Sequence, residues 1–280
     1  MTPITSGKLL ITGKSGYVGA WIVKCAVDRG YSVIAAVRTD AHGQFLVNRF
    51  PEYHGKVSYL IPVIEKDGAY DEGVKDVGGI THTTSPVIFR WGDPRWYQIL
   101  PPSSTYGTSA RLVIQCLAFQ TEVLRPAIRG ALGILESAHR YGRTSSASLW
   151  NTPATTQLEA LGKDTNPSMV YAARKTYAEQ SSWAWVKEHR PSWDLVTILL
   201  PFIWGPYIHK PHFGSSPGRL LENVLDRSDT SCAYAGDCAD VRDTADIHVL
   251  ALENPDAGGE RVLIGTGESI PWSSPCCPAC

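Results

Sequence analysis

Short apolar runs alternate with amphipathic stretches over most of the chain. The apolar runs cover residues 8–12, 32–37, 57–61, 79–83 and 194–200. Each run is short enough for a strand, and the segments between the runs mostly have helical spacing. Strands that alternate with helices in this way predict a parallel sheet with right-handed crossovers. We therefore expect an α/β protein with a doubly wound parallel sheet.

A glycine-rich turn joins the first two runs. Gly13, Gly16 and Gly19 follow the first strand and open a helix with one apolar face. Gly13 allows the tight turn, Gly16 lets the backbone approach a pyrophosphate, and Gly19 lets the helix pack closely on the sheet. The free N–H groups at the helix N-terminus then face the phosphates. The sequence therefore predicts a dinucleotide-binding βαβ unit.

The residue that ends the second strand bears on the choice of nicotinamide cofactor. An acidic residue there binds the ribose 2′-hydroxyl of NAD, whereas an arginine pairs with the 2′-phosphate of NADP. Arg38 occupies this place, so the sequence favours NADP. The alternative is that Arg38 is a solvated surface residue and that Asp40, close by, binds the ribose.

A tyrosine and a lysine stand one helical turn apart in the second half of the chain. Tyr171 and Lys175 begin a long helical pattern, and residues four apart share a helix face. A phenol titrates near pH ~10 and is a weak acid-base group at neutral pH until a cation stabilises its phenolate. Alone, the pair is typical of a solvated helix face. Together with the glycine-rich turn it favours an active site.

Several motifs, in this order, resemble the extended short-chain dehydrogenases of the NAD-dependent epimerase/dehydratase family, specifically the NADP-dependent ketone and aldehyde reductases similar to dihydroflavonol reductase. The motifs are residues 12–19, 36–38, 82–86, 144–146, 171–175, 201–206 and 240–248. The resemblance implies a Rossmann domain over residues 1–205 and a smaller, incomplete substrate-binding lobe over residues 206–280. Within that lobe, residues 238–252 are expected to return to the cofactor side.

The resemblance also implies a reaction, the reduction of a ketone or aldehyde of a small metabolite to the alcohol by NADPH. Tyr171 would give a proton to the developing alkoxide, Lys175 would tune Tyr171 and hold the ribose, and Ser146 would bond the carbonyl oxygen. For His82 a buried core role and cofactor contact stay equally open. The implied cofactor-binding residues are Gly13, Ser15, Gly16, Tyr17, Val18, Gly19, Arg38, Thr83, Ser85, Lys175, Pro201 and Ile203.

The chain departs from the family pattern at several places. Residues 95–120 are an insertion, either a substrate-gating loop or translated intron sequence. Hardly any apolar residues precede Ser146, where the family has a buried strand, and residues 276–280 stand where further helices of the lobe are expected. Val63 replaces an aspartate near the adenine. Two alternatives therefore stay open, an NADP-binding protein without turnover and an NAD-dependent nucleotide-sugar epimerase or dehydratase.

Composition and charge narrow the classes of partner. The chain has 280 residues, 43% hydrophobic and 19% charged, with a net charge of −1, so neither nucleic acid nor a membrane is expected. The N-terminus leads directly into a strand, and we expect a cytoplasmic protein. Seven scattered cysteines predict free thiols. Cys277 and Cys280 have the spacing of a redox pair or half a zinc site, but no second ligand pair stands out, so no metal is expected.

Overall fold

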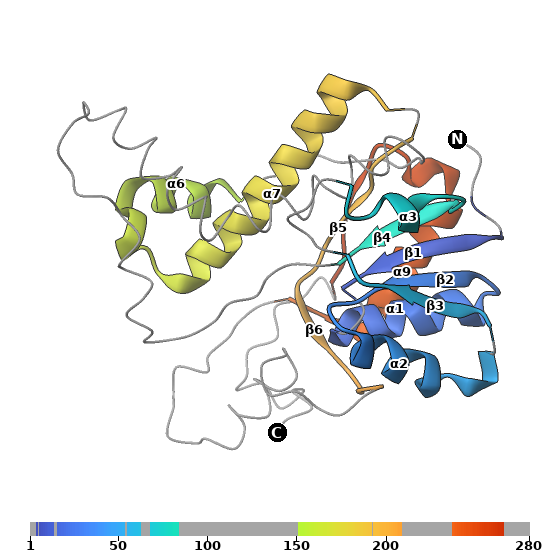
Figure 1. The fold of residues 1–280 in the computed structure, drawn as a ribbon. Coiled ribbons are helices and arrows are strands. Elements are labelled where there is room, and N and C mark those ends of the chain that lie inside the picture. The colour runs from blue at the N-terminus through green and yellow to red at the C-terminus, as the bar shows by residue number, and fades with distance from the viewer. Residues whose placement is uncertain are drawn as a thin grey trace, which may run out of the picture.

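A parallel sheet forms the centre of the fold (Figure 1). The computed structural model describes residues 4, 6–13, 16–53, 55–62, 68–83, 151–191, 193–208 and 237–265. The sheet contains β1 (Lys8–Thr12), β2 (Ser32–Ala36), β3 (Val57–Leu60) and β4 (Gly79–His82), paired in the order β3-β2-β1-β4. The chain moves outward from β1 to β3 and then crosses back to the other side of β1, which is the order of a Rossmann sheet. The predicted doubly wound parallel sheet is confirmed.

Helices cover both faces of this sheet, because successive side chains of a strand point to opposite faces. One face packs against α1 (Tyr17–Asp28), α2 (Asp40–Arg49) and α9 (Val241–Glu253), which together enclose the larger apolar core. The other face packs against the short helix α3 (Asp71–Val74) and the tyrosine that precedes it. The carboxyl ends of the strands are left at one edge, where the strand-to-helix turns lie.

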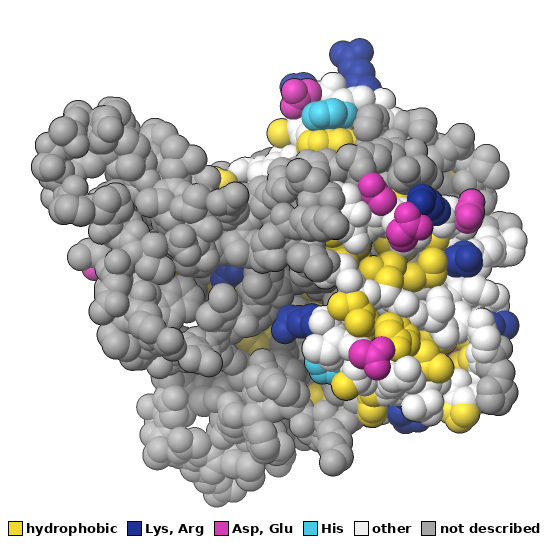
Figure 2. All heavy atoms as spheres, viewed as in Figure 1, with side chains coloured by type: hydrophobic (Ala, Val, Ile, Leu, Met, Phe, Trp, Pro, Cys, Tyr) yellow, Lys and Arg dark blue, Asp and Glu magenta, His cyan; other side chains and the backbone are white. Residues whose placement is uncertain are grey.

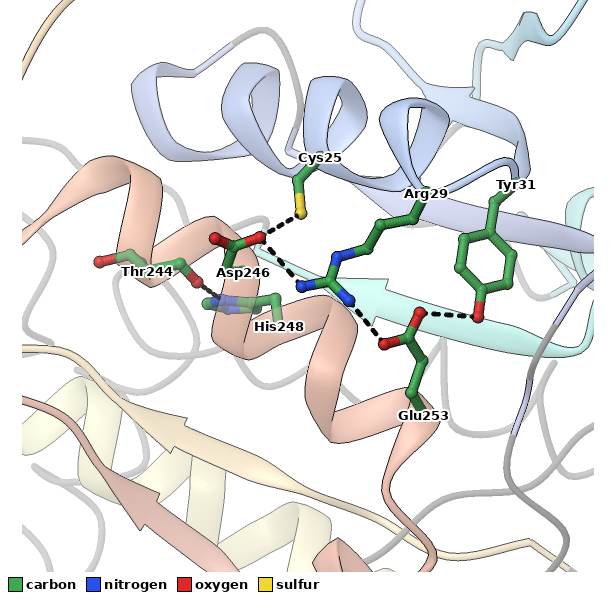
Figure 3. A network of polar contacts seen from close by, with 7 residues as sticks. All are labelled: Cys25, Arg29, Tyr31, Thr244, Asp246, His248 and Glu253. Atoms are coloured by element: carbon green, nitrogen blue, oxygen red, sulfur yellow. Dashed lines mark hydrogen bonds and ion pairs between the residues drawn. The ribbon is translucent and has the colours of Figure 1, made fainter.

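Helix α9 comes from late in the chain but lies against α1, and a polar network joins the two helices (Figure 3). The thiol of Cys25 donates to Asp246 Oδ1 at 2.9 Å. The guanidinium of Arg29 binds Asp246 at 3.2 Å and Glu253 at 2.8 Å. The hydroxyl of Tyr31, which follows α1, donates to Glu253 Oε1 at 3.1 Å. The network fixes α9 on the helix that follows the glycine-rich turn.

The network also makes Cys25 an unreactive thiol. Burial, and then the hydrogen bond to Asp246, raise the pKa of Cys25 to about 12. Only the thiolate reacts with alkylating reagents, so at pH 8 we expect Cys25 to react more than about a hundredfold more slowly than an exposed cysteine. Time-resolved labelling with iodoacetamide, mapped by mass spectrometry, measures this rate. The Asp246→Asn variant should label faster because Arg29 then favours the thiolate, and fast labelling of Cys25 in the unmodified chain would contradict the assignment.

The other described elements form a helix pair and two short strand pairs. They are α6 (Thr152–Leu161), α7 (Pro167–His189), β5 (Thr197–Leu199), β6 (Phe202–Trp204), β7 (Cys238–Asp240) and β8 (Arg261–Leu263), with the 3-10 turns η1 (Pro51–Tyr53), η4 (Gly162–Asp164) and η6 (Pro255–Ala257). β5 pairs in parallel with β8 and β6 pairs in parallel with β7. α6 and α7 pack against each other (Figure 1). The guanidinium of Arg261 in β8 donates two hydrogen bonds, of 2.7 and 2.8 Å, to the carboxylate of Glu179 in α7.

Some expectations fall on parts of the chain that the structure leaves undescribed. The missing strand before Ser146, the insertion at residues 95–120, Val63 and the tail at residues 276–280 all lie outside the described residues. The division into two domains near residue 205 stays a prediction. The expected strand over residues 194–200 is present but shorter, because only Thr197–Leu199 pairs with β8.

The surface of the described residues carries charges of both signs. On the face shown in Figure 2, acidic and basic side chains are interspersed with apolar ones over the sheet unit. No helix in the described part of the chain is long and apolar enough to cross a membrane. Within the same residues, no three His, Cys, Asp or Glu side chains gather in an arrangement that could hold a metal ion.

Candidate functional site

The turn between β1 and α1 has the geometry of a phosphate-binding site. Gly13 has a φ of +71°, which L side chains rarely adopt. The N–H of Gly16 donates to the carbonyl of Gly13 at 3.0 Å, and a Cβ added at Gly16 would lie 3.1 Å from that oxygen. Gly16 is also the N-cap of α1, with no side-chain cap, and the first turn has no acidic residue. The helix N-terminus therefore keeps N–H groups and positive potential for an anion such as a pyrophosphate.

The two residues after Gly16, Tyr17 and Val18, direct their side chains into an apolar cluster. Tyr17 and Ile203 share an apolar cluster with Val241, and Val18 packs against it. The ring of Tyr17 lies 5.0 Å from that of Tyr207, and burial raises its pKa well above the ordinary range of a tyrosine. A bound cofactor would therefore meet Tyr17 through the backbone, as phosphate binding by a helix N-terminus requires. Gly19 is buried within α1, as expected, and Ser15 lies outside the described residues.

The residues after β2 include both candidates for contact with the ribose of a cofactor, Arg38 and Asp40. Arg38 is exposed at the position that the sequence indicated. Asp40 begins α2, and its Oδ1 accepts a hydrogen bond of 2.5 Å from the hydroxyl of Tyr59 on β3. Gln44 donates to the same hydroxyl at 2.9 Å. Asp40 is thus engaged with the neighbouring strand, which disfavours it as the ribose ligand, although it is exposed, as Arg38 is.

Hydrogen bonds tie the ends of β1 and β4 together at the same edge of the sheet. The hydroxyl of Thr83 donates to the carbonyl of Thr12 at 2.7 Å. Thr12 Oγ1 and His82 Nδ1 are 2.9 Å apart, so His82 binds a side chain of the neighbouring strand. The hydroxyl of Thr83 therefore links β4 to β1. Its backbone groups are the part of Thr83 that a cofactor could contact. Ser85 lies outside the described residues.

Tyr171 and Lys175 lie in the second and third turns of α7 and share a helix face, as predicted. Lys175 Nζ is 5.9 Å from the centre of the Tyr171 ring. Burial raises the pKa of Tyr171 above its ordinary value. Lys175 is reachable by solvent, yet the protein around it removes hydration, and this together with the charge of Arg174 lowers its pKa to about 8. Ser146, the third predicted catalytic residue, lies outside the described residues.

One residue near this pair was missed by the sequence analysis. Arg174 is only 4% exposed, and its positive charge lowers the pKa of Tyr171 against the effect of burial. An arginine three residues after Tyr171 is visible in the sequence, but arginine is usually exposed, so its burial could not be read there.

The segment that follows β5 is held against the cofactor-binding unit. Pro201 lies between β5 and β6 and is half-buried. The indole N–H of Trp21 in α1 donates to the carbonyl of Pro206 at 2.8 Å, and Arg49 in α2 donates to that of Ile208 at 2.8 Å. The segment that follows β6 therefore lies beside α1 and α2.

Comparison with known proteins identifies the family. The model of the NAD dependent epimerase/dehydratase family matches residues 109–265, more than half of the chain. The chain belongs to this family. The recognition made from the sequence motifs is thereby confirmed.

Relatives of the chain include reductases and oxidoreductases. The chain is 28% identical to ketoreductase azaE of Aspergillus niger over 93% of its own length and 78% of that protein. It is 30% identical to an uncharacterized oxidoreductase of Schizosaccharomyces pombe, over 94% of its own length and 79% of the relative. The solved structure of Gre2 from Candida albicans with NADPH has the same fold, with a TM-score of 0.71 at 23% identity, covering 93% of this chain and 78% of that one.

Proposed function

We propose that this member of the epimerase/dehydratase family is an NADPH-dependent oxidoreductase that reduces a ketone or aldehyde of a small metabolite to the alcohol. The observation that carries the proposal is the placement of Lys175 Nζ 5.9 Å from the ring of Tyr171, on one face of α7. Relatives that include a ketoreductase support the reaction class. The proposal also takes the protein to be cytoplasmic, with a small carbonyl compound as its substrate.

The described residues fit a nicotinamide dinucleotide. The uncapped N-terminus of α1 suits the pyrophosphate, and the close approach of Gly16 to Gly13 leaves no side chain in its way. Lys175 is the proposed partner of the nicotinamide ribose. When bound, NADPH supplies the hydride. Backbone groups of Thr83, Pro201 and Ile203 are proposed to complete the cofactor site.

Tyr171 is the proposed general acid. As the carbonyl carbon gains hydride, its oxygen gains negative charge, and the Tyr171 hydroxyl donates its proton to that oxygen. Burial raises the pKa of Tyr171, so the phenol is protonated at neutral pH and ready to donate. Ser146 is proposed to hydrogen-bond the same carbonyl oxygen and align it.

NADP is the proposed form of the cofactor, because Arg38 is exposed at the end of β2 while Asp40 binds Tyr59. A guanidinium can pair with a phosphate through two parallel hydrogen bonds. Asp40 gives one of its acceptor oxygens to Tyr59, which leaves it less available to a ribose hydroxyl. Both features support a preference for NADPH over NADH.

Fluorescence titration of the purified chain with NADPH and NADH tests this preference. We expect tighter binding of NADPH, and the Arg38→Ala variant should lose about 10- to 100-fold of its NADPH affinity while its NADH affinity stays nearly unchanged. Arg49→Ala, a nearby α2 arginine that binds Ile208, serves as the matched control for loss of a positive charge. If Arg38→Ala keeps the same preference for NADPH over NADH, Arg38 does not bind the 2′-phosphate. Binding without turnover over a panel of ketones and aldehydes would instead favour an NADP-binding protein without catalysis.

A further inference from the structure

Arg174 is a buried cation beside the proposed proton donor. It follows Tyr171 by three residues on α7, which places the two on neighbouring positions of one helix face. Arg174 is 4% exposed, and arginine is almost never buried to this degree without a charge or dipole to interact with. With so little exposure, its charge is only weakly screened by water.

The two cations near Tyr171 behave differently as the pH rises. The pKa of Lys175 is lowered to about 8, first by the loss of hydration beside the protein and then by the like charge of Arg174. Lys175 therefore loses its charge in the weakly alkaline range. Burial also lowers the pKa of Arg174, but from an ordinary value far above that of lysine, so Arg174 keeps its charge after Lys175 has lost its own.

Two carboxylates on or near α7 bind other groups. On α6, which packs against α7, Glu159 accepts a hydrogen bond of 2.5 Å from Tyr177. On β8, Arg261 is bonded to Glu179, two turns after Tyr171. The positive charge of Arg174 lowers the pKa of Tyr171, against the effect of burial.

We propose that Arg174 is a positioning residue for catalysis in this chain, and that its buried guanidinium stabilises the phenolate of Tyr171. The proposal deepens the proposed function, since it rests on Tyr171 as the proton donor. In the reduction, the O–H bond of Tyr171 breaks, the O–H bond of the alcohol forms, and the hydride supplies the electron pair of the new C–H bond. The negative charge left on the phenolate oxygen then lies beside a positive charge that does not titrate in the working range.

A titration of Tyr171 tests this without any need for turnover. The chain is labelled with ¹³Cζ-tyrosine, and the Tyr171 signal is assigned by its loss in Tyr171→Phe. In Arg174→Met we expect the phenolate fraction of Tyr171 at a given alkaline pH to fall about tenfold, a shift of about one pH unit. Arg174→Lys should restore most of this shift. Lys187→Met, which removes an exposed cation at the far end of α7, should leave the Tyr171 titration unchanged.

The same variants separate the two proposals. With turnover, the pH profile of alcohol oxidation, in which Tyr171 must accept a proton, should move to higher pH in Arg174→Met, with KM for the alcohol little changed. A chain that never turns over but shows the Tyr171 shift contradicts the proposed function and upholds the role of Arg174. An unshifted Tyr171 in folded Arg174→Met overturns that role. If Arg174→Met does not fold, Arg174→Gln is compared with Arg174→Lys. An effect of charge requires that Tyr171 titrates as in the unmodified chain in Arg174→Lys and at higher pH in Arg174→Gln.

Discussion

Replacement of Tyr171 by phenylalanine is expected to lower the rate of carbonyl reduction by about 10²- to 10⁴-fold, the usual contribution of a positioned general acid. The variant loses only the phenol oxygen, so the packing of α7 against α6 should persist. Tyr171 is half-buried on that helix, and the pyrophosphate is proposed to bind the turn before α1 instead. NADPH affinity should therefore stay close to that of the unmodified chain.

Single-turnover reduction at a fixed NADPH concentration measures this effect, with NADPH binding by fluorescence measured in parallel. Tyr177→Phe is the matched control, because Tyr177 lies on the same helix and its hydroxyl binds Glu159 instead of the proposed reacting group. We expect that control to retain most of its rate. A Tyr171→Phe variant that reduces carbonyl compounds at the rate of the control would exclude Tyr171 as the acid.

The sheet could be predicted from the sequence because its strands carry a local signal. The runs at residues 8–12 and 32–37 contain little besides apolar side chains, and the structure has β1 at Lys8–Thr12 and β2 at Ser32–Ala36. The run at residues 194–200 is equally apolar, yet only three of its residues pair, because a strand ends where its partner ends. Apolar periodicity reports burial of a segment and contains no information on the length of its partner.

The finer features of the site depend on contacts between distant residues. The hydrogen bond from Tyr59 to Asp40 joins residues 19 positions apart, and the sequence around either residue does not predict it. The burial of Arg174 likewise depends on what covers α7. The sequence could therefore place Tyr171 and Lys175 on one helix and Arg38 just after β2, whereas the contacts of the charges around them required the three-dimensional structure.

The ion pair between Arg261 and Glu179 is expected to dominate the attachment of α7 to β8. The side chain of Arg261 is 4% exposed and that of Glu179 is 14% exposed, with two hydrogen bonds of 2.7 and 2.8 Å between them. Removing one partner of such a pair leaves the other charge buried without compensation. We expect Glu179→Ala to lower the free energy of unfolding by about 3–5 kcal/mol.

Urea unfolding followed by circular dichroism measures this loss, provided that the transition is cooperative. Glu72→Gln removes the exposed pair with Lys75, whose side chains are 84% and 44% exposed, and should cost less than about 1 kcal/mol. The double variant Glu179→Met with Arg261→Met removes both buried charges and should recover most of the lost stability, since apolar side chains of similar length need no compensation there. If Glu179→Ala costs no more than Glu72→Gln, the pair is screened by solvent. In that case α7 must be held to the sheet by its apolar contacts, among them those of Trp185 and Val186 with Trp193.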